Sequence, residues 1–164
     1  MTVPTTNSTD EQLHRRLGVD LFNRVWQLLE LEDRTPEQDD EMIHAAHASR
    51  YHWSQSGDPE MATRLAIGEW QCSRVYATLG RAEPALHHAA RALILAGSDA
   101  VPIWVRASAH EGMARSLYVA GEAAEAAIHA ATAERLSATI GDEDDREVIS
   151  NDLATLPRQA PTTD

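Results

Sequence analysis

The residues best suited to chemistry are concentrated in one segment, HAAHASRYHW, at positions 44–53. On a helix, His44, His47 and Tyr51 would share one face, because they stand three and four positions apart. Two histidines at i and i+3 can begin a metal site, but such a site needs further ligands, which the sequence does not place. Histidines held by hydrogen bonds are the commoner case. We therefore expect no metal and no cofactor, and keep a small-molecule or metal site in segment 44–53 as the alternative.

Patterns typical of catalytic centres are missing. His110 and Glu111 are followed by Gly-Met-Ala, so the H-E-x-x-H zinc motif is not formed. The serines of the expected helices lack the strand-to-helix turn of a nucleophile elbow. Cys72 falls on an apolar helix stripe, which predicts a small core residue rather than a reactive thiol. The chain contains no lysine, which removes Schiff-base chemistry. We expect a protein that is not an enzyme.

The charge of the chain excludes two classes of partner. Its net charge is −12, and all 14 basic residues are arginines. No basic stripe exists that could displace counterions from nucleic acid, and an anionic membrane surface would repel the chain. The N-terminal residues lack the pattern of a signal peptide, and no apolar run is long enough to span a membrane. We expect an acidic cytoplasmic protein without a nucleic-acid or membrane partner.

Helix signals divide the chain into seven candidate helices. Ser8 with Glu11 forms a potential capping box, Thr35-Pro36 opens the second helix, and Asp58-Pro59 is expected to cap the third. Short connections then make neighbouring helices antiparallel. The polar ends, 1–8 and 157–164, are expected to be flexible tails around one helical domain at 9–156. The expected helices span about 10–31, 36–56, 59–79, 83–96, 102–120, 122–140 and 143–156.

Two stretches of the chain have similar sequence patterns, offset by 41 residues. Aligning Gly80 with Gly121 also aligns the alanines that follow, at 85 and 126, 89 and 130, and 92 and 133. Small residues at these positions let two antiparallel helices approach closely, and glycine accepts the left-handed turn between them. We therefore expect Ala89 and Ala130 to be close helix–helix contacts.

This pattern resembles the tetratricopeptide repeat, a helix–turn–helix unit of about 34 residues. The matching stretches are about 66–97 and 107–138, with a longer loop between them and without the usual proline after the second helix. The resemblance implies an all-α fold of antiparallel helix pairs, stacked as a short right-handed superhelix of about seven helices. In that family the first helix of each pair lines a concave groove. The last helix would serve as the cap that the end of such a stack needs.

The groove provides the candidate binding site. On the third and fifth helices, polar and aromatic side chains share one stripe that the main core does not need. Two arginines and a tryptophan that face such a groove suit a carboxylate or an aromatic-containing peptide, with His47 or Tyr51 at the edge. We expect a non-enzymatic module that binds a protein or peptide partner, with a homodimer as one form of such binding. The expected groove residues are His47, Tyr51, Trp70, Arg74, Ser108, Glu111, Arg115 and Tyr118.

Overall fold

The computed structural model describes residues 8–158 and contains seven α-helices and no strand in that range. The all-α fold class predicted from the sequence is thus confirmed. The predicted tails, 1–8 and 157–164, lie almost wholly outside the described residues. The helices are α1 (Ser8–Leu29), α2 (Pro36–Gln55), α3 (Met61–Thr78), α4 (Ala82–Ala96), α5 (Ile103–Val119), α6 (Ala123–Ser137) and α7 (Glu143–Ala154).

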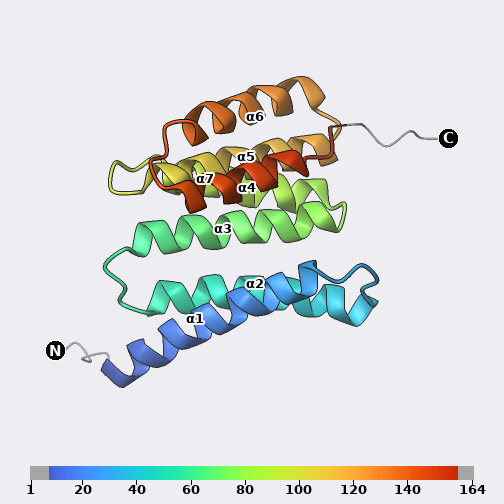
Figure 1. Cartoon of the computed structure of the whole chain (residues 1–164). Helices are drawn as coiled ribbons and strands as arrows, with labels where there is room; N and C mark the ends of the chain where they lie inside the picture. The colour runs from blue at the N-terminus through green and yellow to red at the C-terminus, as the bar shows by residue number, and fades with distance from the viewer. Residues whose placement is uncertain (1–7, 159–164) are drawn as a thin grey trace.

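Successive helices form antiparallel pairs that stack in chain order (Figure 1). Helix α1 packs on α2, α3 on α4 and α5 on α6, and the pairs join through contacts of α2 with α3 and of α4 with α5. The short helix α7 lies against α5 and α6. On the side formed by the first helices of the pairs, α3 packs on α5, whereas α1 barely touches α3. Helix α1 therefore stands off from α3 on this side.

The backbone repeats with the 41-residue offset seen in the sequence. Helices α4 and α6 have bounds that differ by 41 at both ends, and so do the C-terminal ends of α3 and α5. Gly80 and Gly121, which follow α3 and α5, have φ of 69° and 84°. Nothing lies within 4 Å of a Cβ added at either glycine, so the left-handed backbone alone favours glycine there. The same hydrogen bonds close both turns, Arg81 N to Tyr76 O and Glu122 N to Leu117 O, each at 2.9 Å.

The small residues between the helices are buried as the repeat predicts. Ala89 is 0% exposed and Ala130 is 5% exposed. The alanines three or four residues to either side of them are also buried, so one face of α4 and one face of α6 consist of methyl groups. Close approach of α4 and α6 to their partners follows from this composition.

Local signals set some of the helix ends, and two of the predicted caps differ from the structure. Thr35 and Gln38 form a complete capping box on α2, and Asp142 accepts a hydrogen bond from Asp145 N at the start of α7. Asp58 does not cap α3: it accepts from Glu60 N at 2.8 Å, and the helix begins only at Met61. Ser8 is already the first residue of α1. In the described part of the chain, no helix combines the length and the apolar character that a membrane crossing requires.

Candidate binding site

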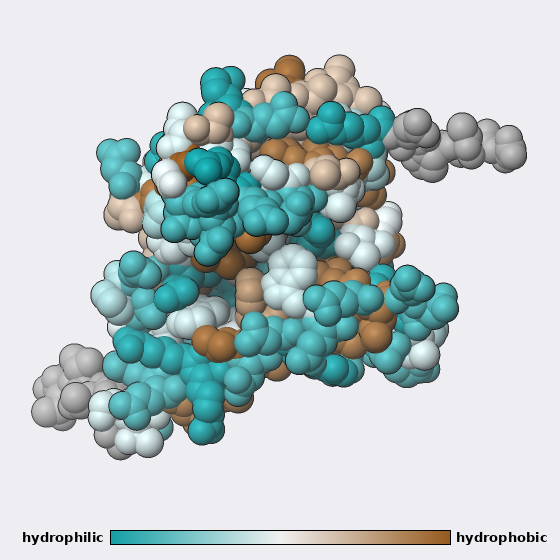
Figure 2. All heavy atoms as spheres, viewed as in Figure 1, coloured by the Kyte–Doolittle hydropathy of each residue, from teal (hydrophilic) through white to brown (hydrophobic). Residues whose placement is uncertain are grey.

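A cavity of about 420 Å³ opens on the side of the stack where α1 stands off from α3. Its walls come from α1, α3, α5 and α7, with one side chain from α2. Figure 2 shows this face of the molecule hollowed between α1 and α7, with apolar side chains inside a hydrophilic surround. The lining residues are Val19, Phe22, Trp26, Trp53, Arg64, Ile67, Gly68, Trp70, Trp104, Val105, Ser108, Asp145, Val148 and Ile149.

All four tryptophans and the only phenylalanine of the chain line this cavity. They come from four helices: Phe22 and Trp26 from α1, Trp53 from α2, Trp70 from α3 and Trp104 from α5. The rings of Trp26 and Trp70 lie 5.8 Å apart between centroids, and Phe22 meets Trp26 nearly edge-on at 6.3 Å. Tilted and edge-on contacts between rings add to the stability gained by burying them. The cavity wall is therefore a packed aromatic surface.

Two glycines inside helices make room for these rings. A Cβ at Gly18 of α1 would stand 2.9 Å from the Trp53 ring, and one at Gly112 of α5 would stand 2.7 Å from Cδ1 of Trp70. Glycine within a helix costs about 1 kcal/mol relative to alanine. At these two positions the close approach of an indole ring explains its presence.

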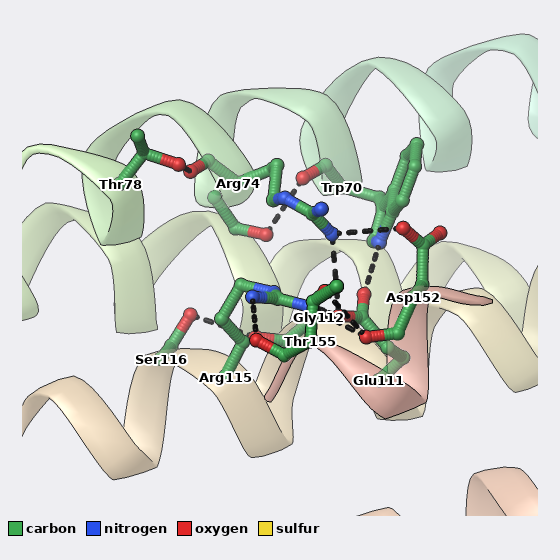
Figure 3. Close-up of polar contacts among 10 residues, drawn as sticks. Trp70, Arg74, Thr78, Glu111, Gly112, Arg115, Ser116, Asp152 and Thr155 are labelled. Atoms are coloured by element: carbon green, nitrogen blue, oxygen red, sulfur yellow. Dashed lines mark hydrogen bonds and ion pairs between the residues drawn. The ribbon is translucent and has the colours of Figure 1, made fainter. Parts of the chain in front are cut away.

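Behind Trp70 lies a buried polar network centred on Glu111 (Figure 3). Trp70 Nε1 donates to Glu111 Oε2 at 3.0 Å, and Arg115 Nε donates to Oε1 at 2.7 Å. Arg74 Nη1 lies 3.4 Å from the same oxygen and 3.1 Å from Asp152 Oδ1 on α7. Arg115 also donates to Thr155 O and Asp152 O, which lie at the end of α7. The network thus fastens α7 to α3 and α5.

Pairing within the network offsets the cost of burying its charged groups. Glu111 is 0% exposed, a position that a carboxylate occupies only when it is paired. Burial raises the pKa of Asp152 and the nearby Glu111 raises it further, while Arg74 and Arg115 oppose the rise. Burial also lowers the pKa of Arg115, against the pull of Glu111. Both guanidinium groups are engaged with protein acceptors, so neither is free for a ligand in this arrangement.

The cavity lining contains two charged residues that lie outside this network. Arg64 stacks over Trp53 at 4.8 Å and lies 3.7 Å from the carboxylates of both Asp58 and Glu60. On α7, Asp145 lines the cavity and makes no ion pair among the described residues. The apolar lips, Val19 on α1 and Val148 on α7, are 45% and 58% exposed. An incoming group therefore meets apolar lips and a carboxylate.

The predicted groove residues fall into three places. Trp70 and Ser108 line the cavity. Arg74, Glu111 and Arg115 do come together, but they form the buried network rather than a surface open to solvent. The remaining member of the fifth-helix stripe, Tyr118, is 9% exposed and packs in the core beneath α6 and α7. The expectation of one open groove differs from the structure because α7 covers this end of the stripe.

His47 and Tyr51 do not line the cavity. His47 Nε2 lies 3.0 Å from the hydroxyl of Tyr76, and its ring packs against His88. Tyr51 is 56% exposed beside His52. Within residues 8–158, no group of three or more His, Cys, Asp or Glu side chains is placed to hold a metal ion.

A second buried carboxylate, that of Glu69, contacts His88, the ring against which His47 packs. Glu69 is 2% exposed and accepts from His88 at 2.7 Å, Arg91 at 2.9 Å and Arg50 at 3.0 Å. Burial alone would raise the pKa of Glu69, but the hydrogen bonds from His88 and Arg91, together with the charges of Arg50 and Arg91, outweigh it and lower the pKa to about 2. Nearby Cys72 is 1% exposed, and burial raises the pKa of its thiol to about 12, so it is a core residue as predicted.

Sequence reasoning missed most of the aromatic wall. Trp26, Trp53, Trp104 and Phe22 were not among the expected site residues, and only Trp70 was. One signal was available: Gly18 and Gly112 interrupt otherwise regular helices, which suggests a close approach by another group. That signal indicates a contact but does not name the ring that makes it.

Comparison of the chain with protein-family models, with curated proteins and with solved structures finds no match. The geometry of the site therefore carries the functional argument.

Proposed function

We propose that this chain is a non-enzymatic, tetratricopeptide-like helical module that binds a partner protein or peptide. The partner inserts a large apolar side chain into the aromatic cavity between α1 and α7. One observation carries this proposal: the four tryptophans and the only phenylalanine converge on a single open cavity. The 41-residue offset between α4 and α6, and between the ends of α3 and α5, supports the likeness to helical repeats.

The chemistry of the lining supports binding rather than reaction. Apart from Arg64, Asp145 and Ser108, the lining consists of apolar and aromatic residues. The Ser108 hydroxyl donates to Trp104 O at 3.1 Å, within its own helix. Aromatic pockets of this kind are the places where partner side chains contribute most binding energy. Burying a Leu or Phe side chain there would contribute about 1.5–3 kcal/mol.

The experiment is a selection of short peptides from a random library on the purified chain. Bound peptides are then tested on two matched variants, Val148→Arg and Ile128→Arg. Val148 is a lip of the cavity, whereas Ile128 lies on α6 away from it, and both side chains are largely exposed. We expect Val148→Arg to abolish binding and Ile128→Arg to leave it intact. Peptides that bind both variants equally well would refute the cavity as the docking site.

A second function is favoured by the size of the cavity. Its volume of about 420 Å³ lies within the range of sites for small molecules, and Trp53 of the segment 44–53 contributes to its wall. A small apolar molecule bound there would be detected by native mass spectrometry of the purified chain. Loss of that molecule in Val148→Arg, but not in Ile128→Arg, would favour this function over peptide binding.

A further inference from the structure

The surroundings of the aromatic cavity are acidic. Among the residues that the structure describes, Arg64 is the only cation in the lining, and carboxylates of Asp58 and Glu60 each lie 3.7 Å from it. Opposite, α7 brings Asp145 into the lining and places the exposed residues Glu143 and Asp144 beside it. The basic residue of this helix start, Arg146, donates to Ile140 O at 2.9 Å and keeps its positive charge. The carboxylates of Glu143, Asp144 and Asp145 outnumber it, so the net charge of this rim is negative.

Deeper basic residues do not change this balance. Arg74 and Arg115 are held by Glu111 and by α7, behind the Trp70 ring. The whole chain is also negatively charged, with a net charge of −12. An approaching segment thus meets an apolar, aromatic interior behind a negative entrance.

We propose that the partner segment is basic: a large apolar side chain for the cavity, flanked by Lys or Arg residues that face the carboxylates of α7 and of the α3 start. This inference rests on the proposed function and names the class of its partner. Charge complementarity at the rim speeds association and excludes acidic competitors, while the apolar anchor supplies the affinity.

An acidic partner segment, with a carboxylate placed against Arg64, would bind less favourably. A ligand carboxylate would have to compete with Asp58 and Glu60, which both lie 3.7 Å from this guanidinium. It would also enter beside Asp145, and like charges placed together disfavour binding. The acidic peptide is therefore used as an arm of the test.

The test uses three tryptophan-free peptides with the same Leu-Phe-Leu centre, flanked on both sides by Lys, Gln or Glu. Because every tryptophan of the chain lines the cavity, binding is followed by intrinsic tryptophan fluorescence. At low salt we expect the Lys peptide to bind about tenfold more tightly than the Gln peptide, and the Glu peptide to bind most weakly. The preference should shrink as salt rises, because exposed charges are screened.

A matched pair of variants distinguishes the effect of the rim carboxylates on binding from the effect of the overall negative charge of the chain. The double variant Asp144→Asn/Asp145→Asn should lose most of the preference for Lys flanks. The control Glu122→Gln/Glu125→Gln removes the same charge at the start of α6, where neither residue lines the cavity, and should keep the preference. Equal losses in both variants would show non-specific attraction and overturn the inference.

The remaining outcomes distinguish the inference from the proposed function. If the three peptides bind equally and Val148→Arg abolishes binding, the basic partner is wrong while the proposed function stands. Tightest binding by the Glu peptide would also overturn the inference and would assign the contact to Arg64. If none of the peptides changes the fluorescence, both the inference and the proposed function fail.

Discussion

The helix pairs α3/α4 and α5/α6 have similar backbone geometry but different polar residues at equivalent positions. With the offset of 41, Glu69 corresponds to His110 and His88 to His129. In the first pair a carboxylate meets an imidazole at 2.7 Å, and in the second two imidazoles meet at 3.0 Å. The repeated geometry brings these two positions together in both pairs. Residue type then decides whether the contact joins a carboxylate to an imidazole or two imidazoles to each other.

The same comparison extends to the next position along each helix. Trp70 corresponds to Glu111, and the two are hydrogen bonded to each other across the stack. Each pair therefore buries one glutamate, but at different places. Glu69 faces the second helix of its own pair, whereas Glu111 joins α3, α5 and α7. Equivalent backbone positions thus hold two polar clusters that connect different sets of helices.

The largest effect is expected from removing Glu111. Glu111→Ala leaves Arg74 and Arg115 without their buried carboxylate, and should lower the free energy of unfolding by roughly 3–5 kcal/mol. Glu69→Ala should cost less, roughly 1–3 kcal/mol, because its partner Arg91 is half-exposed and regains water. Urea unfolding of both variants measures the difference. A larger loss in Glu69→Ala would mean that the α3/α4 centre, not the α7 attachment, dominates stability.

The next test asks whether the two helix pairs are packed equally closely. Ala89→Leu and Ala130→Leu should each overpack the interface and cost roughly 1–3 kcal/mol. The adjacent exposed residues Ala90 and Ala131 provide controls, and their substitution by Leu should change stability by less than about 0.5 kcal/mol. Thermal unfolding compares the four variants. Buried variants that melt like their exposed controls would contradict the close contact.

A smaller effect is expected at the turns. Gly80→Ala and Gly121→Ala should each cost about 1–2 kcal/mol, because both glycines have positive φ and alanine disfavours it. Gly97 ends α4 with φ of −71°, so Gly97→Ala should be nearly neutral. Equal losses at Gly80 and Gly121, measured by urea unfolding, would confirm that the repeated turns are energetically equivalent. Unequal losses would show that tertiary contacts distinguish them.

The smallest effect concerns pH and separates the two polar pairs. Burial and the neighbouring His129 lower the pKa of His110 from 6.5 to about 4. The unfolded chain therefore takes up a proton below pH 6.5 that the folded chain refuses, and stability falls as pH drops from 6.5 toward 4. The pKa of Glu69 is lowered from 4.5 to about 2, so its contribution is lost only between pH 4.5 and 2.

His110→Glu places in α5/α6 the residue types of the Glu69–His88 pair. We expect the melting temperature of this variant to fall less between pH 7 and pH 5 than that of the parent. His87→Glu makes the same change at an exposed position of α4 and should follow the parent. If all three proteins lose stability in parallel, the two-histidine contact does not cause the acid sensitivity.

Helix limits and the repeat could be predicted from the sequence because their causes are local. The capping box at Thr35, the turn glycines and the alanine spacing act over one or two helical turns. Where a prediction of this kind was wrong, the competitor was also local: Asp58 closes a turn with Glu60 N instead of capping α3. The burial of Cys72 and Ala89 followed equally from helical periodicity.

The site was predictable only in part. Trp70, Arg74, Glu111 and Arg115 were expected to lie together, since the repeat register places them on one stripe, and the hydrogen bonds join them. Their burial could not be foreseen. It depends on the end of α7, which supplies Asp152 and Thr155 from far along the chain.

The amino-acid sequence by itself determined which segments are helical, where they turn and which faces are small enough to pack closely. Tertiary structure alone decided that α1 stands off from α3, that α7 covers the Glu111 network, and that tryptophans from four different stretches of chain meet. Helix ends and periodicity are set by neighbours within a few residues. A cavity depends instead on the angles at which whole helices pack, and those angles follow from all their contacting side chains at once.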